Sequence, residues 1–407
     1  MRRTERRFTP RARPSGSAGD SVVLPPALER SVARGHPWIY RDHVPSKFHA
    51  PTGTLLRVVA GRAVAYGLWD ESSAIALRLL RTRERPNREF VRARLKQAYE
   101  LRAPLRSQAI TGYRFLNGEG DGLPGMVLDR YDQWMVLLTS SPAVESLVPW
   151  VLGTINEVEP CRGVLWRHPG TGSKPAADLE LLTGEMPPSS LVIRDRELRF
   201  YADLGSGQKS GLYFDQRDNR RAIEPYCREA RVLDLFSYTG GFAVAATRFG
   251  ARSTTCVDQA EAALDRARDN FRLNALDTNG HEFIRADCFE WLKHRAADGS
   301  RFDLVICDPP SLTRNRLGLD RALAAYAKLN AMAMTQVRDG GYLAAASCTA
   351  QVSPTDFRRT LGEAARRAGC RFQVVAETGH AIDHPIDAAH PEGRYLKFVI
   401  GRVLRGS

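Results

Sequence analysis

The stretch Val232-Leu-Asp-Leu-Phe-Ser-Tyr-Thr-Gly-Gly-Phe242 decides the fold class of this 407-residue chain. An apolar strand that ends in Asp234 is followed by a glycine-containing turn, and the turn opens a helix. In doubly wound α/β sheets such a turn lies outside the carboxyl end of a strand, where ligands bind. The stretch is not Gly-x-Gly-x-x-Gly, and no Gly-Lys-Ser/Thr follows, so it is neither a dinucleotide fingerprint nor a P-loop.

Strands and helices alternate on both sides of this stretch, from about residue 191 to the C-terminus. The strands are nearly continuous apolar runs, which is typical of a parallel sheet covered on both faces. We therefore predict a C-terminal Rossmann-like, doubly wound α/β sheet. Its predicted strands are 231–236, 253–257, 282–285, 302–307, 341–347, 372–377 and 397–403, and its predicted helices are 240–248, 260–274, 289–295, 320–337 and 355–368.

The N-terminal half shows a different organisation, and we predict three further segments there. Residues 1–20 are arginine-rich and weakly hydrophobic, which favours a disordered basic tail. Residues 21–84 contain short strands with turn signals and predict a small β-rich domain. Residues 85–190 predict a separate α+β domain, with a helix near 143–155, and residues 191–407 form the doubly wound domain.

Composition excludes several classes of protein. The longest apolar runs fall well short of the roughly 18 residues that span a bilayer, and the N-terminus lacks the apolar core of a secretory signal. Seven cysteines without Cys-x-x-Cys spacing disfavour a disulfide framework and a zinc site. We therefore expect a cytoplasmic protein with free thiols, no membrane partner and no metal.

The balance of charge favours a polyanionic partner. Lysine and arginine number 59 against 46 acidic residues, which gives a net charge of +13 and a pI near 9.7. Such a surface attracts nucleic acid. Only seven of the basic residues are lysines, so the arginine excess can equally reflect genome base composition.

Acids recur at the ends of successive predicted strands. Asp258 ends the second strand, where an acid can accept both hydroxyl groups of a ribose. Asp287 ends the third strand, where it can accept a hydrogen bond from an adenine amino group. Together with Asp234, this series resembles class I S-adenosylmethionine-dependent methyltransferases.

The fourth and fifth predicted strands are each followed by a residue that can take part in catalysis. Leu304-Val-Ile-Cys-Asp308-Pro-Pro-Ser311 ends in a rigid Asp-Pro-Pro turn, and Ser347-Cys348-Thr349 follows the next strand. If these strands are neighbours, the Cys348 thiol and the Asp308 carboxyl face one pocket. A thiolate that attacks carbon 6 of cytosine makes carbon 5 nucleophilic. Cys307 precedes Asp308 within a strand, so its side chain should point to the other face of the sheet.

A polar segment precedes the sheet, and it completes a family resemblance. Gly205–Arg220 predicts a hairpin leading into a polar helix, in which the Gln216 amide can pair with a carboxylate or an ammonium group. The neighbouring Arg217, Arg220 and Arg221 can neutralise a phosphate or the methionine carboxylate. Gly211–Arg220, Phe-Ser-Tyr-Thr-Gly-Gly-Phe, Asp-Pro-Pro and Ser-Cys-Thr, in this order, are similar to the PUA-domain-containing class I family of 23S ribosomal RNA cytosine-5 methyltransferases.

The resemblance extends to Ser31–Tyr40, Gly118–Gly125 and Pro391–Lys397, and it implies a PUA domain, a central α+β domain and a catalytic domain. It implies S-adenosylmethionine as cofactor, 23S ribosomal RNA as partner, Cys348 as nucleophile and Asp308 beside it; related proteins often self-associate, so a homodimer is a further expectation. The predicted cofactor-binding residues are Gln216, Asp234, Phe236, Ser237, Thr239, Gly240, Asp258, Gln259, Asp287, Cys288, Asp308 and Pro309.

The sequence leaves three functions open: methylation of cytosine carbon 5, methylation of a purine nitrogen, and RNA binding without catalysis. Two departures from the family pattern weaken the first of them. Ser311 stands where other RNA cytosine-5 families carry a second cysteine, and Ala350-Gln351 follows the Ser-Cys-Thr motif where related versions contain histidine. Methylation of a ribosomal purine nitrogen, such as guanine N7, needs no thiol at all. A non-catalytic RNA-binding or assembly factor is the third reading. Within the predicted PUA stretch, His36 and Trp38 can either stack on RNA bases or pack locally.

Overall fold

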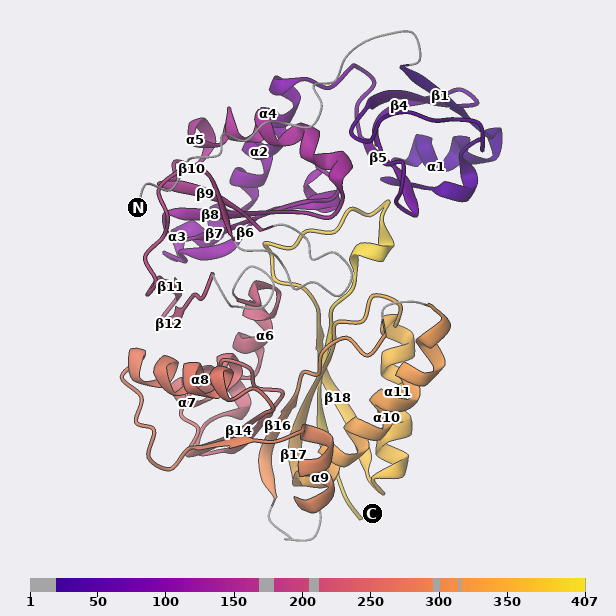
Figure 1. Ribbon diagram of the computed structural model, residues 1–407. Coiled ribbons are helices and arrows are strands. Elements are labelled where there is room, and N and C mark those ends of the chain that lie inside the picture. The colour runs from indigo at the N-terminus through magenta and orange to yellow at the C-terminus, as the bar shows by residue number, and fades with distance from the viewer. Residues whose placement is uncertain (1–19, 168–178, 205–211, 296–300, 314–315, 407) are drawn as a thin grey trace. The chain divides into compact units, whose positions relative to one another are not determined.

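The computed structural model describes residues 20–167, 179–204, 212–295, 301–313 and 316–406, and they form two compact units (Figure 1). The first unit runs to Ile193 and includes residues 202–212 and 383–393. The second unit contains residues 194–201, 213–382 and 394–407. The predicted tail, except for residue 20, and the glycine-rich part of the predicted hairpin lie outside the described residues. None of the described helices is long and apolar enough to cross a membrane.

The first unit begins with a five-stranded sheet in the order β1-β3-β4-β5-β2, over which lies helix α1 (Glu29–Arg34). Leu56, Val58, Trp69 and Leu77 belong to its core and are fully buried. The β-rich character predicted for this region is therefore confirmed. The strands are β1 (Ser21–Leu24), β2 (Trp38–Tyr40), β3 (Leu55–Ala60), β4 (Ala63–Trp69) and β5 (Ile75–Leu80).

A second five-stranded sheet in the same unit has the order β10-β9-β8-β7-β6. The single helix predicted near 143–155 is wrong, because Pro149 restarts the helix and Gly153 ends it. A 3₁₀ turn (Pro142–Leu147) and two short helices replace it. The elements are β6 (Gly112–Asn117), β7 (Met126–Tyr131), β8 (Trp134–Thr139), β9 (Gly163–Arg167), β10 (Glu180–Gly184), α2 (Arg88–Leu101), α3 (Ala103–Ser107), α4 (Val148–Leu152) and α5 (Ile155–Val158).

Within this unit the side chains of His36 and Trp38 pack locally. Trp38 donates Nε1–H to Oε1 of Glu119 at 2.8 Å, and its ring lies edge-on to His390 with 4.3 Å between the ring centroids. The His36 ring also contacts the Trp38 ring edge-on. Of the two readings left open by the sequence, the structure favours packing.

The second unit contains the predicted doubly wound sheet, with seven strands in the order β15-β14-β13-β16-β17-β19-β18. Neighbouring strands from β15 to β17 are parallel, and β19 pairs antiparallel with both β17 and β18. The strands are β13 (Arg231–Leu235), β14 (Ser253–Asp258), β15 (Glu282–Arg285), β16 (Phe302–Cys307), β17 (Val337–Ser347), β18 (Arg371–Thr378) and β19 (Lys397–Leu404). A hairpin of β11 (Val192–Asp195) and β12 (Leu198–Tyr201) precedes the sheet in the chain.

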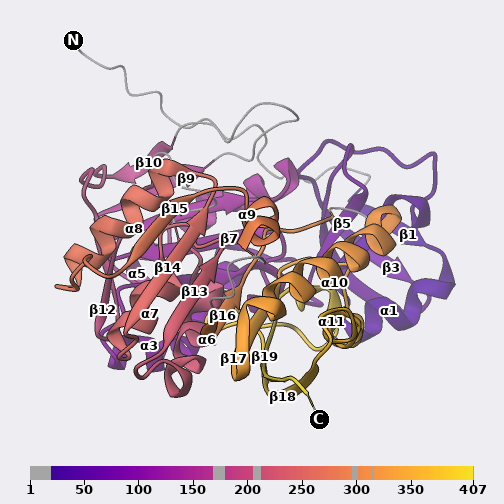
Figure 2. The ribbon, with the colours of Figure 1, turned by 90° about the horizontal axis from the view of Figure 1, so that it is seen from below.

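Helices cover both faces of this sheet (Figure 2). One core layer joins Val305 and Leu343 of the sheet to α9, α10 and α11, and the other joins Leu304 and Ile306 to Phe242 of α7. Alternate residues of β16 thus enter opposite cores, as the period of a β-strand requires. The helices are α6 (Arg217–Ala222), α7 (Gly241–Arg248), α8 (Glu261–Leu273), α9 (Cys288–Arg295), α10 (Leu319–Gln336) and α11 (Pro354–Arg367).

Candidate active site

The candidate site lies at the carboxyl ends of the central strands in the second unit. Loop 236–240 follows β13, Asp308 follows β16, and Cys348 follows β17. Asp258 is the last residue of β14. Because these strands are parallel neighbours, their ends share one edge of the sheet, where open α/β sheets bind ligands.

Cys348 and Asp308 follow directly from neighbouring strands. Strand β16 pairs parallel with β17, with Cys307 opposite Ala345, so the predicted strand adjacency is confirmed. The half-buried Cys348 thiol donates to the carbonyl oxygen of Pro309 at 3.9 Å. Cys307 is fully buried, and burial raises the pKa of its thiol well above the ordinary value. Cys348, and not Cys307, therefore has the exposure that a nucleophile needs.

A chain of amide hydrogen bonds holds the Asp308 carboxyl group. Gln216 donates Nε2–H to Oδ2 of Asp308 at 2.9 Å, and its own Oε1 accepts from Nδ2 of Asn219 at 2.6 Å. Oδ1 of Asn219 accepts from the Thr378 hydroxyl at 2.6 Å. Gln216 and Asn219 are buried, so the chain of bonds fixes the orientation of the carboxyl group. The sequence left open whether Gln216 pairs with a carboxylate or an ammonium group, and Asn219 was missed.

Two tyrosines, Tyr213 and Tyr395, interact with the carboxyl groups of Asp308 and Asp215, respectively. Burial, followed by the charges of Tyr238, Asp308, Asp215 and Cys348, raises the pKa of the Tyr213 phenol well above its ordinary value. The Tyr395 hydroxyl donates to Oδ2 of Asp215 at 2.6 Å. Tyr213 therefore stays neutral near Cys348. Sequence reasoning singled out none of Tyr213, Asp215 and Tyr395, although all three lie in segments that carry the family resemblance.

Lys397 is a further residue that sequence reasoning missed. It lies opposite Ser347 in the antiparallel pair of β17 and β19, and its side chain is 3% exposed. Its Nζ donates to the carbonyl oxygens of Thr349 at 2.6 Å and Tyr395 at 2.8 Å. Burial lowers the pKa of Lys397 to about 8, while the Cys348 thiolate acts to raise it.

Loop 236–240 has an unusual backbone. Phe236, Tyr238 and Gly240 have φ angles of 59°, 48° and 73°, in the left-handed region that side chains other than glycine rarely adopt. Such residues cluster at functional sites, where the surrounding structure holds them in place. The Phe236 N–H donates to the buried Cys288 sulfur at 3.3 Å, and the Ser237 N–H donates to the carbonyl oxygen of Val257 at 3.1 Å.

The Asp258 carboxylate fixes the same loop from β14. Its Oδ2 accepts from the Tyr238 N–H and its Oδ1 from the Ala260 N–H, each at 2.9 Å. The residue is half-buried, and each carboxylate oxygen has a second lone pair. An acceptor of this kind at the end of the second strand fits the two hydroxyl groups of a ribose, so these residues fit the adenosine part of S-adenosylmethionine.

Two of the predicted acids, Asp234 and Asp287, also bind backbone N–H groups at helix starts. Asp234 is 1% exposed and accepts the Ala243 N–H in the first turn of α7 at 3.1 Å. Burial, together with the charges of Asp308 and Asp258, raises its pKa well above the ordinary value. Asp287 is exposed, and its Oδ1 accepts the N–H groups of Phe289 and Glu290, as a cap of α9 does.

The remaining predicted cofactor residues differ in exposure. Ser237, Gly240, Cys288 and Pro309 are buried, whereas Gln259 is exposed. The carbonyl oxygen of half-buried Thr239 accepts from Nδ2 of Asn270 at 2.9 Å. The structure thus brings the residues of loop 236–240 to Asp258 and Cys288. Among the described residues, the Gln259 side chain makes no such contact.

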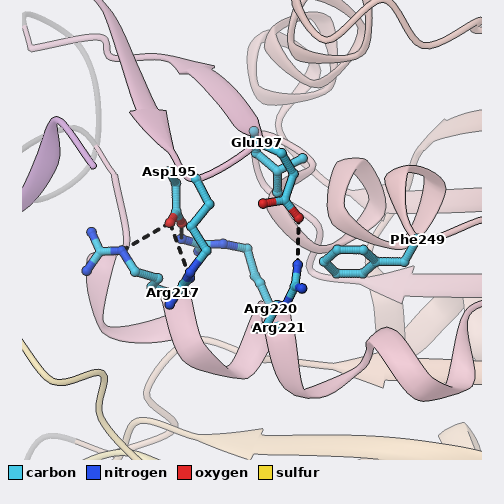
Figure 3. A pocket seen from close by; sticks show the side chains of 8 residues that line it. Asp195, Glu197, Arg217, Arg220, Arg221 and Phe249 are labelled. Atoms are coloured by element: carbon cyan, nitrogen blue, oxygen red, sulfur yellow. Dashed lines mark hydrogen bonds and ion pairs between the residues drawn. The ribbon is translucent and has the colours of Figure 1, made fainter. Parts of the chain in front are cut away.

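The arginines near Gln216 are already paired with carboxylates (Figure 3). Arg217 and Arg220 lie 3.3 and 3.1 Å from the carboxylate oxygens of Asp195, and Arg221 lies 2.6 Å from Glu197. They line a pocket of about 10 Å³ that has room for roughly one water molecule. Arg217 and Arg220 share the single carboxylate of Asp195, so the fold compensates their positive charges only in part. The role of these arginines in neutralising a phosphate or the methionine carboxylate stays a prediction.

Comparison with known proteins agrees with this geometry. A family model described as S-adenosylmethionine-dependent methyltransferase matches residues 164–386, and one described as a PUA-like domain matches residues 22–82. Two solved structures share the fold. The structure of SMU.776, assigned as a methyltransferase and complexed with SAH, has a TM-score of 0.83 at 20% identity, and one from Streptococcus mutans has 0.82 at 19%; each covers 94% of this chain and 100% of the other.

Curated relatives are closer in sequence. Ribosomal RNA large subunit methyltransferase I of Aeromonas salmonicida is 34% identical over 390 residues, which cover 94% of this chain and 98% of the relative. The protein of the same name from Klebsiella pneumoniae (strain 342) is 35% identical over 393 residues, with the same coverage. The chain is therefore an S-adenosylmethionine-dependent methyltransferase and belongs to the ribosomal RNA large subunit methyltransferase I family.

Proposed function

We propose that this enzyme methylates carbon 5 of a cytidine in 23S ribosomal RNA through a covalent adduct with Cys348. The observation that carries the proposal is the position of the half-buried Cys348 thiol, 3.9 Å from the carbonyl oxygen of Pro309, next to Asp308. Methylation of a purine nitrogen requires no thiol. A thiol and a carboxyl group at the ends of neighbouring strands are the two groups that cytosine carbon 5 requires.

The chemistry begins at the sulfur atom. The Cys348 thiolate attacks carbon 6, the S–C6 bond forms, and the electrons of the C5–C6 double bond shift into the ring. Addition of the thiolate makes carbon 5 enamine-like and nucleophilic, and Asp308 hydrogen-bonds the cytosine edge and helps protonate ring nitrogen 3, which receives the displaced electron pair. S-adenosylmethionine, when bound, would supply the methyl group that carbon 5 takes up, and S-adenosylhomocysteine would leave. A base then removes the carbon 5 proton, nitrogen 3 returns its proton to Asp308, the C5–C6 double bond re-forms, and the cysteine thiolate leaves.

The roles of the supporting residues follow from their contacts. Gln216, bonded to Asp308 at 2.9 Å, keeps the carboxyl group oriented toward its substrate. Loop 236–240 and Asp258 hold the adenosine part of the cofactor. The target base has to leave its stack to reach carbon 6, so the cytidine is expected to be flipped out or single-stranded.

The proposal includes the partners and the location of the enzyme. The relatives' names and the PUA-like domain support ribosomal RNA as the substrate. Free thiols and the identity of the substrate support the cytoplasm as the place of reaction. We include a homodimer as the expected assembly, which light scattering of the purified full chain can test.

The test maps methylated positions in ribosomal RNA. Cells that lack the gene receive the wild-type gene, a Cys348→Ser variant or a Cys161→Ser variant, and 5-methylcytidine in 23S RNA is mapped by bisulfite sequencing. Cys161 is a half-buried thiol of the first unit and serves as the matched control. We expect one cytidine mark to be restored by the wild type and Cys161→Ser only. Restoration by Cys348→Ser, or a lost mark on a guanine, would contradict the proposal.

A further inference from the structure

The Lys397 ammonium group is unusual because it is buried beside the candidate nucleophile. Its side chain is 3% exposed, and the partners of Nζ among the described residues are the carbonyl oxygens of Thr349 and Tyr395. Neither of these hydrogen bonds, nor the charges that act on Lys397, involves a carboxylate of the described residues. Removing a charge from water without an opposite charge nearby costs free energy, so the burial of this ammonium group calls for a functional explanation.

The position of Lys397 supplies that reason. Strand β19 pairs Lys397 with Ser347, the residue before Cys348, and Nζ bonds the carbonyl of Thr349, the residue after it. The backbone of Lys397 is therefore paired with the residue before the cysteine, and its ammonium group is bound to the carbonyl oxygen of the residue after it. A cation close to a thiol stabilises the thiolate, which is the form that attacks carbon 6.

Two described tyrosines near Cys348 do not supply a positive charge. Tyr213 and Tyr326 interact electrostatically with it, and burial raises the pKa of both phenols, to about 12 for Tyr326, so they are neutral at ordinary pH. Asp308, when ionised, disfavours a thiolate. Arg394 acts on Lys397 and lowers its pKa, as like charges do.

We propose that Lys397 is a positioning residue that maintains Cys348 as a thiolate through its buried positive charge. The inference rests on the proposed function for its meaning in catalysis, but the pair itself is a property of the resting enzyme. Lys397 touches neither the base nor the methyl group in this account. It acts through the cysteine, and it holds the Cys348 segment by its two carbonyl contacts.

The test measures cysteine reactivity in the full chain without RNA or cofactor. Iodoacetamide labelling of each cysteine is followed against pH by mass spectrometry, and the half-buried Cys161 and Cys370 serve as internal references. Burial raises the pKa of both reference thiols. We expect the Cys348 midpoint to lie below both references. A wild-type midpoint at or above that of Cys161 would overturn the proposal, whether or not any variant folds.

Three variants separate charge from hydrogen bonding. Lys397→Gln keeps a donor without charge, Lys397→Met keeps neither, and Lys397→Arg keeps the charge. We expect Lys397→Gln and Lys397→Met to raise the Cys348 midpoint by about one pH unit or more, with the references unmoved, and Lys397→Arg to stay near the wild type. An unchanged midpoint in folded Lys397→Gln, or an equal rise in Lys397→Arg, would overturn the role of charge.

The methylation rates of the same variants test whether the interaction of Lys397 with Cys348 affects the reaction. The acid limb of the pH–rate profile is expected to move upward in Lys397→Gln by the same amount as the labelling midpoint. If Cys348→Ser keeps its methylation while the wild-type midpoint is low, the proposed reaction fails and the lysine–cysteine pair stands. If Cys348→Ser is inactive but the labelling midpoint of wild-type Cys348 is not below the references, the proposed role of Lys397 is contradicted and the proposed reaction stands.

Discussion

Gln216 donates its side-chain amide to Oδ2 of Asp308 at 2.9 Å, one residue before the carbonyl group that the Cys348 thiol contacts. This bond joins the segment before α6 to the end of β16. It places a carboxyl group and a thiol at one edge of the sheet, with the carboxyl group oriented by a buried amide.

The first prediction concerns this carboxyl group. Asp308→Asn should lower kcat about 10²–10⁴-fold, because the amide cannot help to protonate the cytosine ring. Gln216→Leu should lower kcat about tenfold or more, since Asp308 loses its orienting donor. Single-turnover methylation at saturating S-adenosylmethionine measures both. A variant with intact kcat and weakened cofactor affinity would show that Asp308 is a cofactor ligand only.

The second prediction distinguishes Asp258 from Asp287, which the sequence places at the ends of successive strands. Asp258→Asn should weaken S-adenosylhomocysteine binding about 10–100-fold, because the ribose loses a charged acceptor. Asp287→Ser keeps a cap on α9 but shortens the side chain, so its effect should be smaller. Titration calorimetry with S-adenosylhomocysteine measures both affinities. An equal loss in Asp287→Ser would mean that Asp287 contacts the adenine.

The third prediction follows from the buried Asp234. Its pKa is raised in the folded state, so the folded chain binds a proton more tightly than the unfolded chain does. Stability is therefore lost as pH rises above the ordinary Asp range, by up to about 1.4 kcal/mol per pH unit until the raised pKa is reached. Asp234→Asn keeps an acceptor for Ala243 and removes this loss. Urea unfolding between pH 4 and 8 should show its advantage over the wild type grow with pH, and a constant difference would contradict the account.

The fourth prediction concerns the strained loop. Gly240 has a φ of 73°, and a Cβ at this position would lie 2.8 Å from Cβ of Ala267. Gly240→Ala should therefore destabilise the second unit by about 1–3 kcal/mol. It should also weaken cofactor binding, because the loop has to move. Gly362→Ala, in an open position of α11, is the matched control and should have little effect on either measurement.

Much of the second unit could be predicted from the sequence, because strong apolar runs mark its strands. The predicted strands 282–285 and 302–307 agree residue by residue with β15 and β16. Adjacency of β16 and β17 follows from the usual order of such sheets, and it placed Asp308 near Cys348.

The residues that were missed depend on tertiary pairing. Lys397 opens a strand that was predicted, but only the antiparallel pairing of β19 with β17 brings it to Ser347. No local pattern reports that pairing. By contrast, the capping role of Asp287 had a signal in the sequence, since an acid followed by Glu290 three residues later is typical of a helix start.

The most direct test of the central claim is covalent trapping. RNA that carries 5-fluorocytidine at the target position lacks the proton that must leave carbon 5, so the Cys348 adduct cannot resolve. With wild-type enzyme and S-adenosylmethionine, we predict a protein–RNA band that survives denaturing electrophoresis and that peptide mapping assigns to Cys348. The same band from Cys348→Ser, or methyl transfer by the wild type without any trapped species, would contradict the account.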